Sequence, residues 1–100
     1  MRAGQLKQWQ LFYNTNNYLC LVYKIEHGRA LIVNYNGTFY KANRDSEHEY
    51  SDEVPEETVE QFFDNFPLEK VDYYKERQEL ESIKDLYYLI ERKFKLMLLC

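Results

Sequence analysis

The chain is poor in the residues that mark several common protein classes. Its 100 residues include two cysteines, three glycines and two prolines. Two cysteines cannot build a disulfide framework, so we expect a buried free thiol at Cys20 and an exposed thiol at Cys100. The glycines stand alone at Gly4, Gly28 and Gly37, which excludes a glycine-rich phosphate-binding loop. No apolar run reaches the roughly 18 residues that cross a membrane, and no signal-peptide core is present, so we expect a cytoplasmic protein.

Basic residues are absent from one quarter of the chain. Residues 1–44 carry six lysines or arginines and one acidic residue, a net charge of +5. Residues 45–69 carry ten acidic residues and no basic residue, a net charge of −10, and residues 70–100 have a net charge of +1. The overall charge of −4 conceals this separation. The pattern excludes a uniformly basic nucleic-acid binder and indicates a locally acidic surface.

The first 43 residues combine alternating hydrophobicity with turn signals, the pattern of an antiparallel β-meander. We predict four strands, over residues 6–13, 18–26, 29–35 and 38–43. The first strand places Trp9 and Leu11 on one face. The turns between the strands are Asn14–Asn17, His27–Gly28 and Asn36–Gly37. An Asn-Gly pair favours a type I′ hairpin turn, because both residues tolerate a positive φ.

The remaining residues predict a connection followed by helices. Residues 44–53 are polar and acidic, which indicates a loop. Pro55 suits a first helical position, and acidic residues in the first turn suit the helix dipole, so we predict a short amphipathic helix over 55–65. Residues 68–72 are a candidate closing strand, which would be the fifth. From residue 73 the pattern is helical, and the whole chain is predicted to be one α+β domain.

The C-terminal helix is predicted to be about 36 Å long, at roughly 1.5 Å per residue, which is longer than a compact meander is wide. Its apolar residues recur at intervals of three and four. Two interpretations are open. Either the helix covers one face of the sheet, or its far end meets a second copy of the chain. A dimer interface would then contain Ile83, Tyr87, Ile90, Phe94 and Met97.

The sequence contains no local arrangement typical of catalysis. Nucleophilic catalysis needs an activated Ser or Cys beside a positioned base, and neither His27 nor His48 stands in such a pattern. The carboxylates around His48 match no defined calcium or zinc site, so we expect no metal, no cofactor and no enzymatic activity. A toxin-type ribonuclease is our third hypothesis, but RNA binding favours positive charge where this chain is acidic.

Two binding hypotheses remain. In the first, the acidic segment competes for a basic groove that normally receives phosphates, by the same long-range attraction. Its candidate residues are Glu47, Glu49, Asp52, Glu53, Glu56, Glu57 and Glu60, with Tyr50 as an anchor. In the alternative, the chain is a small nucleic-acid-binding barrel on which bases stack. That site would use Lys7, Lys24, Arg29 and Lys41 with the aromatic residues Trp9, Tyr13, Tyr35 and Tyr40.

Four segments resemble short proteins of phages and mobile elements: Ala3–Trp9, Tyr18–Tyr23, Asn36–Gly37 and Pro55–Phe63. Many of those proteins are SH3-like barrels followed by a helix. They include phage-encoded inhibitors of host defence, among them CRISPR inhibitors that imitate DNA. The resemblance implies an SH3-like sheet or small barrel in a protein that acts in the bacterial cytoplasm. It also implies inhibition of a host nucleic-acid-handling protein, such as a CRISPR effector or another nuclease, and it transfers no functional residue.

Overall fold

The computed structural model describes residues 1–71 and 74–99, with the side chains of residues 1–71 and 74–92. The chain divides into two compact units, Met1–Lys70 and Val71–Cys100. The first unit contains the sheet and the acidic segment, and the second contains one long helix.

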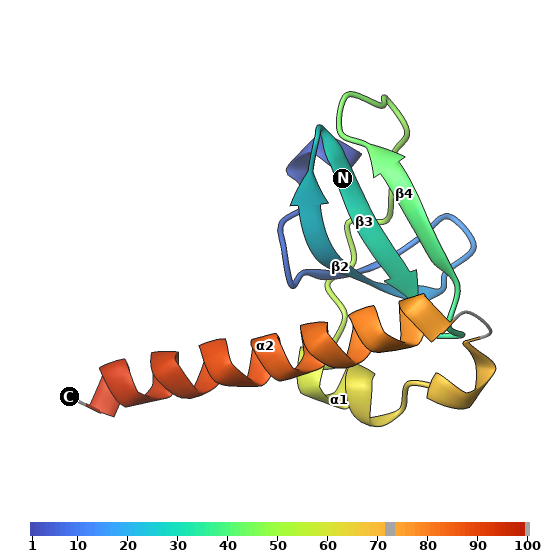
Figure 1. Ribbon diagram of the computed structural model, residues 1–100. Coiled ribbons are helices and arrows are strands. Elements are labelled where there is room, and N and C mark those ends of the chain that lie inside the picture. The colour runs from blue at the N-terminus through green and yellow to red at the C-terminus, as the bar shows by residue number, and fades with distance from the viewer. Residues whose placement is uncertain (72–73, 100) are drawn as a thin grey trace. The chain divides into compact units, whose positions relative to one another are not determined.

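The first unit is built on a four-stranded antiparallel sheet, which confirms the predicted α+β class. Its strands are β1 (Leu11–Tyr13), β2 (Leu19–Glu26), β3 (Arg29–Asn34) and β4 (Phe39–Asn43). They follow one another in the order β1-β2-β3-β4, so every connection is a hairpin. Figure 1 labels β2, β3 and β4 side by side in this order. Within the described residues, β1 and β4 are the edge strands. The register of β2 shifts between Val22 and Lys24, which adds a bulge to its pairing with β3.

The turns lie where the sequence predicts them, but one has a different type. His27 and Gly28 both adopt a positive φ, of 52° and 71°, as a tight reversal requires. At the last hairpin only Gly37 has a positive φ, of 92°. The Gly37 N–H donates to the carbonyl of Asn34 over 2.9 Å, so the turn begins at Asn34, one residue earlier than a turn centred on Asn36–Gly37. The predicted type I′ turn is therefore wrong, although the hairpin itself is confirmed.

The first strand is much shorter than predicted. Residues 3–5 form a 3-10 helix, η1 (Ala3–Gln5), and regular pairing starts only at Leu11. Trp9 interrupts the strand because it adopts the left-handed conformation, with a φ of 66°, which is costly for a bulky side chain. The carbonyl of Val22 accepts the Trp9 N–H over 2.7 Å and holds this turn in place. Trp9 and Leu11 were expected on one face of this strand; both are half-buried, but only Leu11 lies within β1.

One face of the sheet carries a compact apolar core. Phe12, Cys20, Val22, Ala30 and Ile32 are fully buried there, and η1 covers them together with Leu6. All residues of β3 after Arg29 are buried, as expected for a central strand. Cys20 is the buried free thiol that the sequence predicts, whereas Cys100 lies outside the described residues. Tyr40 donates its hydroxyl hydrogen to the Cys20 sulfur over 3.3 Å.

The helix of the acidic segment begins later than predicted. It is α1 (Val59–Asp64), and Thr58 is its N-terminal cap. The Thr58 hydroxyl oxygen accepts the backbone N–H of Gln61 over 3.1 Å, and the side-chain oxygen of Gln61 accepts the backbone N–H of Thr58 over 2.9 Å. This reciprocal capping box outweighs the preference of Pro55 for a first helical position. Where a closing strand was a candidate, the chain forms a second 3-10 helix, η2 (Leu68–Lys70), and Asp72 lies outside the described residues.

The second unit is the predicted C-terminal helix, α2 (Tyr74–Leu99). Its 26 residues span about 39 Å at roughly 1.5 Å per residue. Leu80 is buried, whereas Leu86, Leu89 and Ile90 are between 46% and 56% exposed. Among the described residues, no helix combines the length and the apolar character that crossing a membrane requires.

Arg44 joins the N-terminal segment to the end of β4. Its guanidinium donates to the carbonyl of Leu6 and to the carbonyl of Gly4, each over 2.8 Å. The backbones approach closely here, because a Cβ on Gly4 would lie only 2.8 Å from the Arg44 carbonyl oxygen. A forked side chain suits this pair of acceptors, whereas an ammonium group cannot reproduce the same fork.

We predict that Arg44→Lys lowers the free energy of unfolding by about 1–2 kcal/mol, because one charge-assisted hydrogen bond is lost. Urea denaturation measures the change. Arg29→Lys is the matched control: Arg29 is exposed on β3, so we expect a change below about 0.5 kcal/mol. Equal losses in the two variants would contradict the assigned role of Arg44.

Candidate functional site

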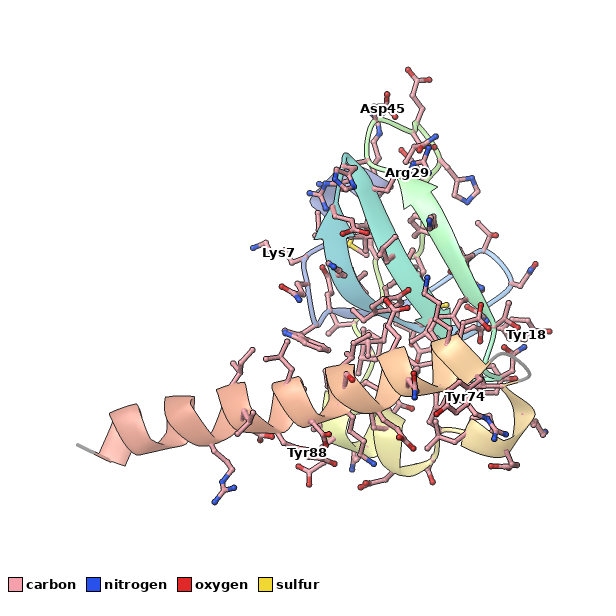
Figure 2. The ribbon with its side chains drawn as sticks, viewed as in Figure 1. Lys7, Tyr18, Arg29, Asp45, Tyr74 and Tyr88 are labelled. Carbon is pink, nitrogen blue, oxygen red and sulfur yellow. The ribbon has the colours of Figure 1, made fainter. Side chains whose placement is uncertain are left out.

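The ten acidic residues of segment 45–69 are all exposed and follow the sheet from end to end. We call them the acidic strip: Asp45, Glu47, Glu49, Asp52, Glu53, Glu56, Glu57, Glu60, Asp64 and Glu69. Asp45 lies with Arg29 at the end of the sheet where β4 ends (Figure 2). Helix α1 lies at the opposite end (Figure 1). The carboxylates are therefore spread along the sheet rather than gathered in one cluster.

Backbone pairing with the first two residues fixes the beginning of the strip. Arg2 and Glu49 form an antiparallel bridge, and the Tyr50 N–H donates to the Met1 carbonyl over 2.6 Å. The Met1 amino group donates to the Tyr50 carbonyl over 3.0 Å and pairs with the Asp52 carboxylate at 2.6 Å. The Arg2 guanidinium lies 3.8 Å from the Glu49 carboxylate. Two of the ten carboxylates thus have cationic partners.

The other eight carboxylates of the strip form no ion pair within the part of the chain that the structure describes. Segment 45–69 contains no lysine or arginine that could neutralise them from within. Neighbouring charges of one sign raise the local potential, and that potential extends about 8–10 Å into physiological salt. The strip is therefore a strongly negative surface on a chain of modest net charge.

The strip passes from one face of the sheet to the other around β1. On the first face, Tyr50 packs edge-on against Phe12, with the ring centroids 5.1 Å apart. On the second face, Glu53 and Glu57 lie close enough to Tyr13 to affect its ionisation. Because successive residues of a strand point to opposite faces, Phe12 and Tyr13 mark the two faces. The middle of the strip therefore borders the edge of the sheet.

The electrostatic effect of the strip is visible at Tyr13. Burial raises the pKa of its phenol, and the nearby carboxylates of Glu57, Glu53 and Glu56 raise it further. The physical cause of the second contribution is that a phenolate is repelled by the negative charges beside it. All three glutamates therefore raise the pKa of the same tyrosine.

A groove lies between the middle of the strip and the segment that precedes β1. Its volume is about 560 Å³. The apolar part of its lining comes from Trp9, Leu11, Val54, Pro55 and Val59. Asp52, Glu53 and Glu57 also line it, together with Met1, Gln5, Gln10 and Thr58. We call this feature the acidic groove, because it combines apolar walls with three carboxylates and no lysine or arginine.

A second hollow of about 360 Å³ lies at the α1 end of the sheet. Aromatic residues dominate its lining: Tyr13, Tyr18, Tyr35 and Phe62. The rings of Tyr18 and Tyr35 meet edge-on, 5.6 Å apart. Glu57 lines both this hollow and the acidic groove, so it is the acidic residue that the two depressions share.

The structure brings some of the predicted site residues together and separates others. Asp52, Glu53 and Glu57 meet at the acidic groove, and Glu56 is exposed beside them. Glu47 and Glu49 lie earlier, near the bridge to Arg2, and Glu60 is on α1. Tyr50, the predicted anchor, is half-buried, with its ring between Phe12 and His48, so only part of it is accessible.

The apolar half of the acidic groove is absent from the predicted site. The sequence pattern predicts a strand at Trp9, whereas Trp9 adopts a left-handed turn and lines the groove. One signal was present in the sequence: the apolar pair Val54–Pro55 interrupts an otherwise acidic and polar run. Val54 is 83% exposed, which is unusual for an aliphatic side chain.

The basic residues of the alternative hypothesis are all exposed. Lys24 and Lys41 flank the buried Leu31 in the register of the sheet, and Arg29 lies further along the same face. Glu26 pairs with Lys24 at 3.1 Å and so reduces the positive charge of this face. Lys7 lies apart from them, between η1 and β1.

The aromatic residues of the alternative hypothesis are less available than predicted. Tyr35 is exposed, whereas Trp9 and Tyr13 are partly buried. Tyr40 packs against the core and bonds to Cys20, and burial strongly raises its pKa, so its prediction as an exposed stacking residue is wrong.

The residues of the predicted dimer interface are only partly described. Ile83 and Tyr87 are partly buried on α2, and Ile90 is exposed beside Leu86 and Leu89. The side chains of Phe94 and Met97 lie outside those that the structure describes. The dimer stays a prediction. Of the predicted interface residues whose side chains the structure describes, only Ile90 is exposed, and it lies in an exposed apolar surface with Leu86 and Leu89.

The described residues offer little for catalysis. Burial raises the pKa of the Cys20 thiol, which disfavours the thiolate that a nucleophile needs. The ring of His48 meets that of Tyr50 edge-on, with the centroids 4.9 Å apart, and His27 occupies a turn. No group of His, Cys, Asp and Glu in the described part of the chain is arranged to hold a metal ion. The chemistry that the site supports is electrostatic attraction combined with apolar contact.

Comparisons of the chain with protein-family models, with curated proteins and with solved structures found no match. The acidic strip and the acidic groove are therefore the features that bear on function.

We predict that the triple variant Glu53→Gln, Glu56→Gln, Glu57→Gln lowers the raised pKa of Tyr13 towards the usual value near 10. The contribution of burial remains, so the shift is reduced rather than abolished. NMR titration of a protein labelled at the tyrosine ring carbons measures this pKa. The control is the triple variant Glu47→Gln, Asp64→Asn, Glu69→Gln, which removes the same charge elsewhere on the strip. It should leave the pKa of Tyr13 unchanged. A common shift in both triple variants would contradict the local action of the three glutamates.

Proposed function

We propose that the chain is a non-enzymatic inhibitor of a host nucleic-acid-handling protein, acting in the bacterial cytoplasm. It presents the acidic strip to the basic surface on which its partner receives nucleic acid, and so acts as a DNA mimic. A CRISPR effector is one such partner. The observation that carries the proposal is the strip itself: ten exposed carboxylates along one sheet, eight of them without an ion pair in the described residues.

The physical basis of the proposal is competition between carboxylates and phosphates. A nucleic-acid site uses lysines and arginines to neutralise phosphates, and the release of counterions provides much of its affinity. Carboxylates spread along a rigid sheet offer the same lysines and arginines an alternative set of negative charges. Because both interactions are electrostatic, they are steered over long distances and weaken as salt is added.

The alternative function, binding of single-stranded nucleic acid, is favoured by one observation. Lys24, Arg29 and Lys41 are exposed on one face of the sheet. Two findings weigh against it: Glu26 pairs with Lys24, and Tyr40 is held in the core rather than offered for stacking. The acidic strip would also repel the phosphates of a bound strand. We therefore rank inhibition first, binding of single-stranded nucleic acid second and toxin-type ribonuclease activity third.

The proposal predicts that the immobilised chain captures nucleic-acid-handling proteins from a bacterial lysate, identified by mass spectrometry. Capture should decrease strongly between about 0.05 M and about 0.3 M salt, because the screening length shortens. Duplex DNA added to the lysate should displace the captured proteins, because the two ligands compete for one site. A labelled oligonucleotide should not bind the chain itself at physiological salt.

Two charge-reversed variants make this experiment specific. Reversal of Glu53, Glu56 and Glu57 to Lys should abolish capture, because it changes the charge at the centre of the strip. Reversal of Glu76, Glu81 and Asp85 to Lys, on α2, changes the net charge equally and should leave capture intact. Oligonucleotide binding by the unmodified chain, or capture that survives the first reversal, would contradict the proposed function.

We further propose that the chain forms a homodimer through α2, by means of the apolar residues around Ile90. Exposed apolar area on a helix is removed from water when two copies meet, at about 25 cal/mol per Å². We predict a dimer in light scattering at tens of micromolar protein, and a monomer for the variant Ile90→Glu. The variant Glu81→Gln, also exposed on α2, should remain dimeric. A monomeric unmodified chain at that concentration would disprove the dimer.

A further inference from the structure

The acidic groove differs from the rest of the acidic strip in its apolar walls. Trp9, Val54 and Pro55 line it together with carboxylates, and Val54 is among the most exposed apolar residues of the chain. Imitation of a phosphate backbone requires negative charge alone. Apolar walls next to carboxylates require a ligand that is itself both apolar and cationic.

Two side chains combine an apolar stem with a positive charge, lysine and arginine. Arginine fits the groove better for two reasons. Its planar guanidinium is less strongly hydrated than an ammonium group, so it loses less when it enters a groove with apolar walls. It also presents several N–H donors in a fixed fork, which can bond to two carboxylates at once.

The carboxylates of the groove are not equivalent. Asp52 already pairs with the Met1 amino group at 2.6 Å. Glu53 and Glu57 have no ion pair in the described part of the chain, and both are exposed. Both also line the groove, together with Trp9 and Pro55. They are therefore the pair that a cation entering the groove would meet.

We propose that the acidic groove binds an arginine side chain of the partner protein, with the stem against Trp9 and Pro55 and the guanidinium bonded to Glu53 and Glu57. The volume of about 560 Å³ lies within the range of about 300–1,000 Å³ that small-ligand pockets occupy, so a whole arginine side chain fits. This proposal rests on the proposed function and identifies the central contact of that interaction. The remaining carboxylates of the strip then provide attraction at longer range.

The chain carries its own reporter for this contact, because Trp9 is its only tryptophan. The probe is a tetra-arginine peptide that is acetylated at its N-terminus and amidated at its C-terminus. Titration at low salt should change the emission of Trp9 and reach saturation. A tetra-citrulline peptide, which has the same shape without the charge, should cause no change. Tetra-lysine should bind more weakly, and an equal response to tetra-lysine would overturn the assignment to arginine.

Two matched double variants separate the groove from the general charge of the strip. Glu53→Gln with Glu57→Gln should weaken the binding of tetra-arginine by about tenfold or more, since two charged acceptors are lost. Glu47→Gln with Glu69→Gln removes the same charge from other parts of the strip and should change the affinity by less than about twofold. Each substituted residue is exposed, so both variants keep the fold, which circular dichroism verifies.

The outcomes distinguish this proposal from the proposed function. If tetra-arginine binds by calorimetry without a change in Trp9 emission, and both double variants weaken it equally, the groove proposal is overturned while the strip still attracts basic ligands. If tetra-arginine does not bind at low salt while nucleic-acid-handling proteins are still captured and displaced by DNA, the groove proposal alone is also overturned. If Trp9 responds as expected but no such protein is captured, the groove is upheld and the proposed function fails.

Discussion

The backbone pairing of Met1–Arg2 with Glu49–Tyr50 is the constraint on which the acidic site depends. It places the ring of Tyr50 on Phe12, at the edge of the apolar core, and so links the acidic strip to the most buried part of the sheet. From this fixed position the chain can pass around β1 and reach α1. Without it, residues 45–58 would be a connection with few contacts, and its carboxylates would separate under their own repulsion.

The remaining contacts hold the strip at intervals rather than continuously. Ser46 and Ser51 accept backbone N–H groups two residues further on, and the Thr58 capping box fixes the start of α1. Between these positions lie the carboxylates without ion pairs. A segment fixed at several positions along a rigid sheet keeps its charges in a defined arrangement, and it loses less conformational freedom when a partner binds. These contacts give the strip a defined backbone path between the bridge to Arg2 and the start of α1.

The sequence predicted the elements whose cause is local. Strands β2 to β4 were correct to within about one residue, because turn residues such as His27–Gly28 specify a hairpin from within it. The two failures have different causes. The left-handed turn at Trp9, held by the distant Val22 carbonyl, ends the first strand early. The start of α1 is decided locally, by the Thr58–Gln61 capping box, and the prediction gave more weight to Pro55. The acidic residues of the site were visible in the sequence, but its apolar half was not, because Trp9 joins it only through the fold.

The position of the strip beside β1 has a consequence for the chain in concentrated solution. An edge strand presents unpaired backbone groups and can recruit the edge of another molecule, which is a common first step in aggregation. Here β1 has only three residues, and Glu53, Glu56 and Glu57 lie beside its end. Two such edges repel each other as they approach, while the other edge strand, β4, carries the exposed Lys41. The carboxylates proposed to meet a basic partner would thus also keep this edge of the sheet from pairing with its own copies.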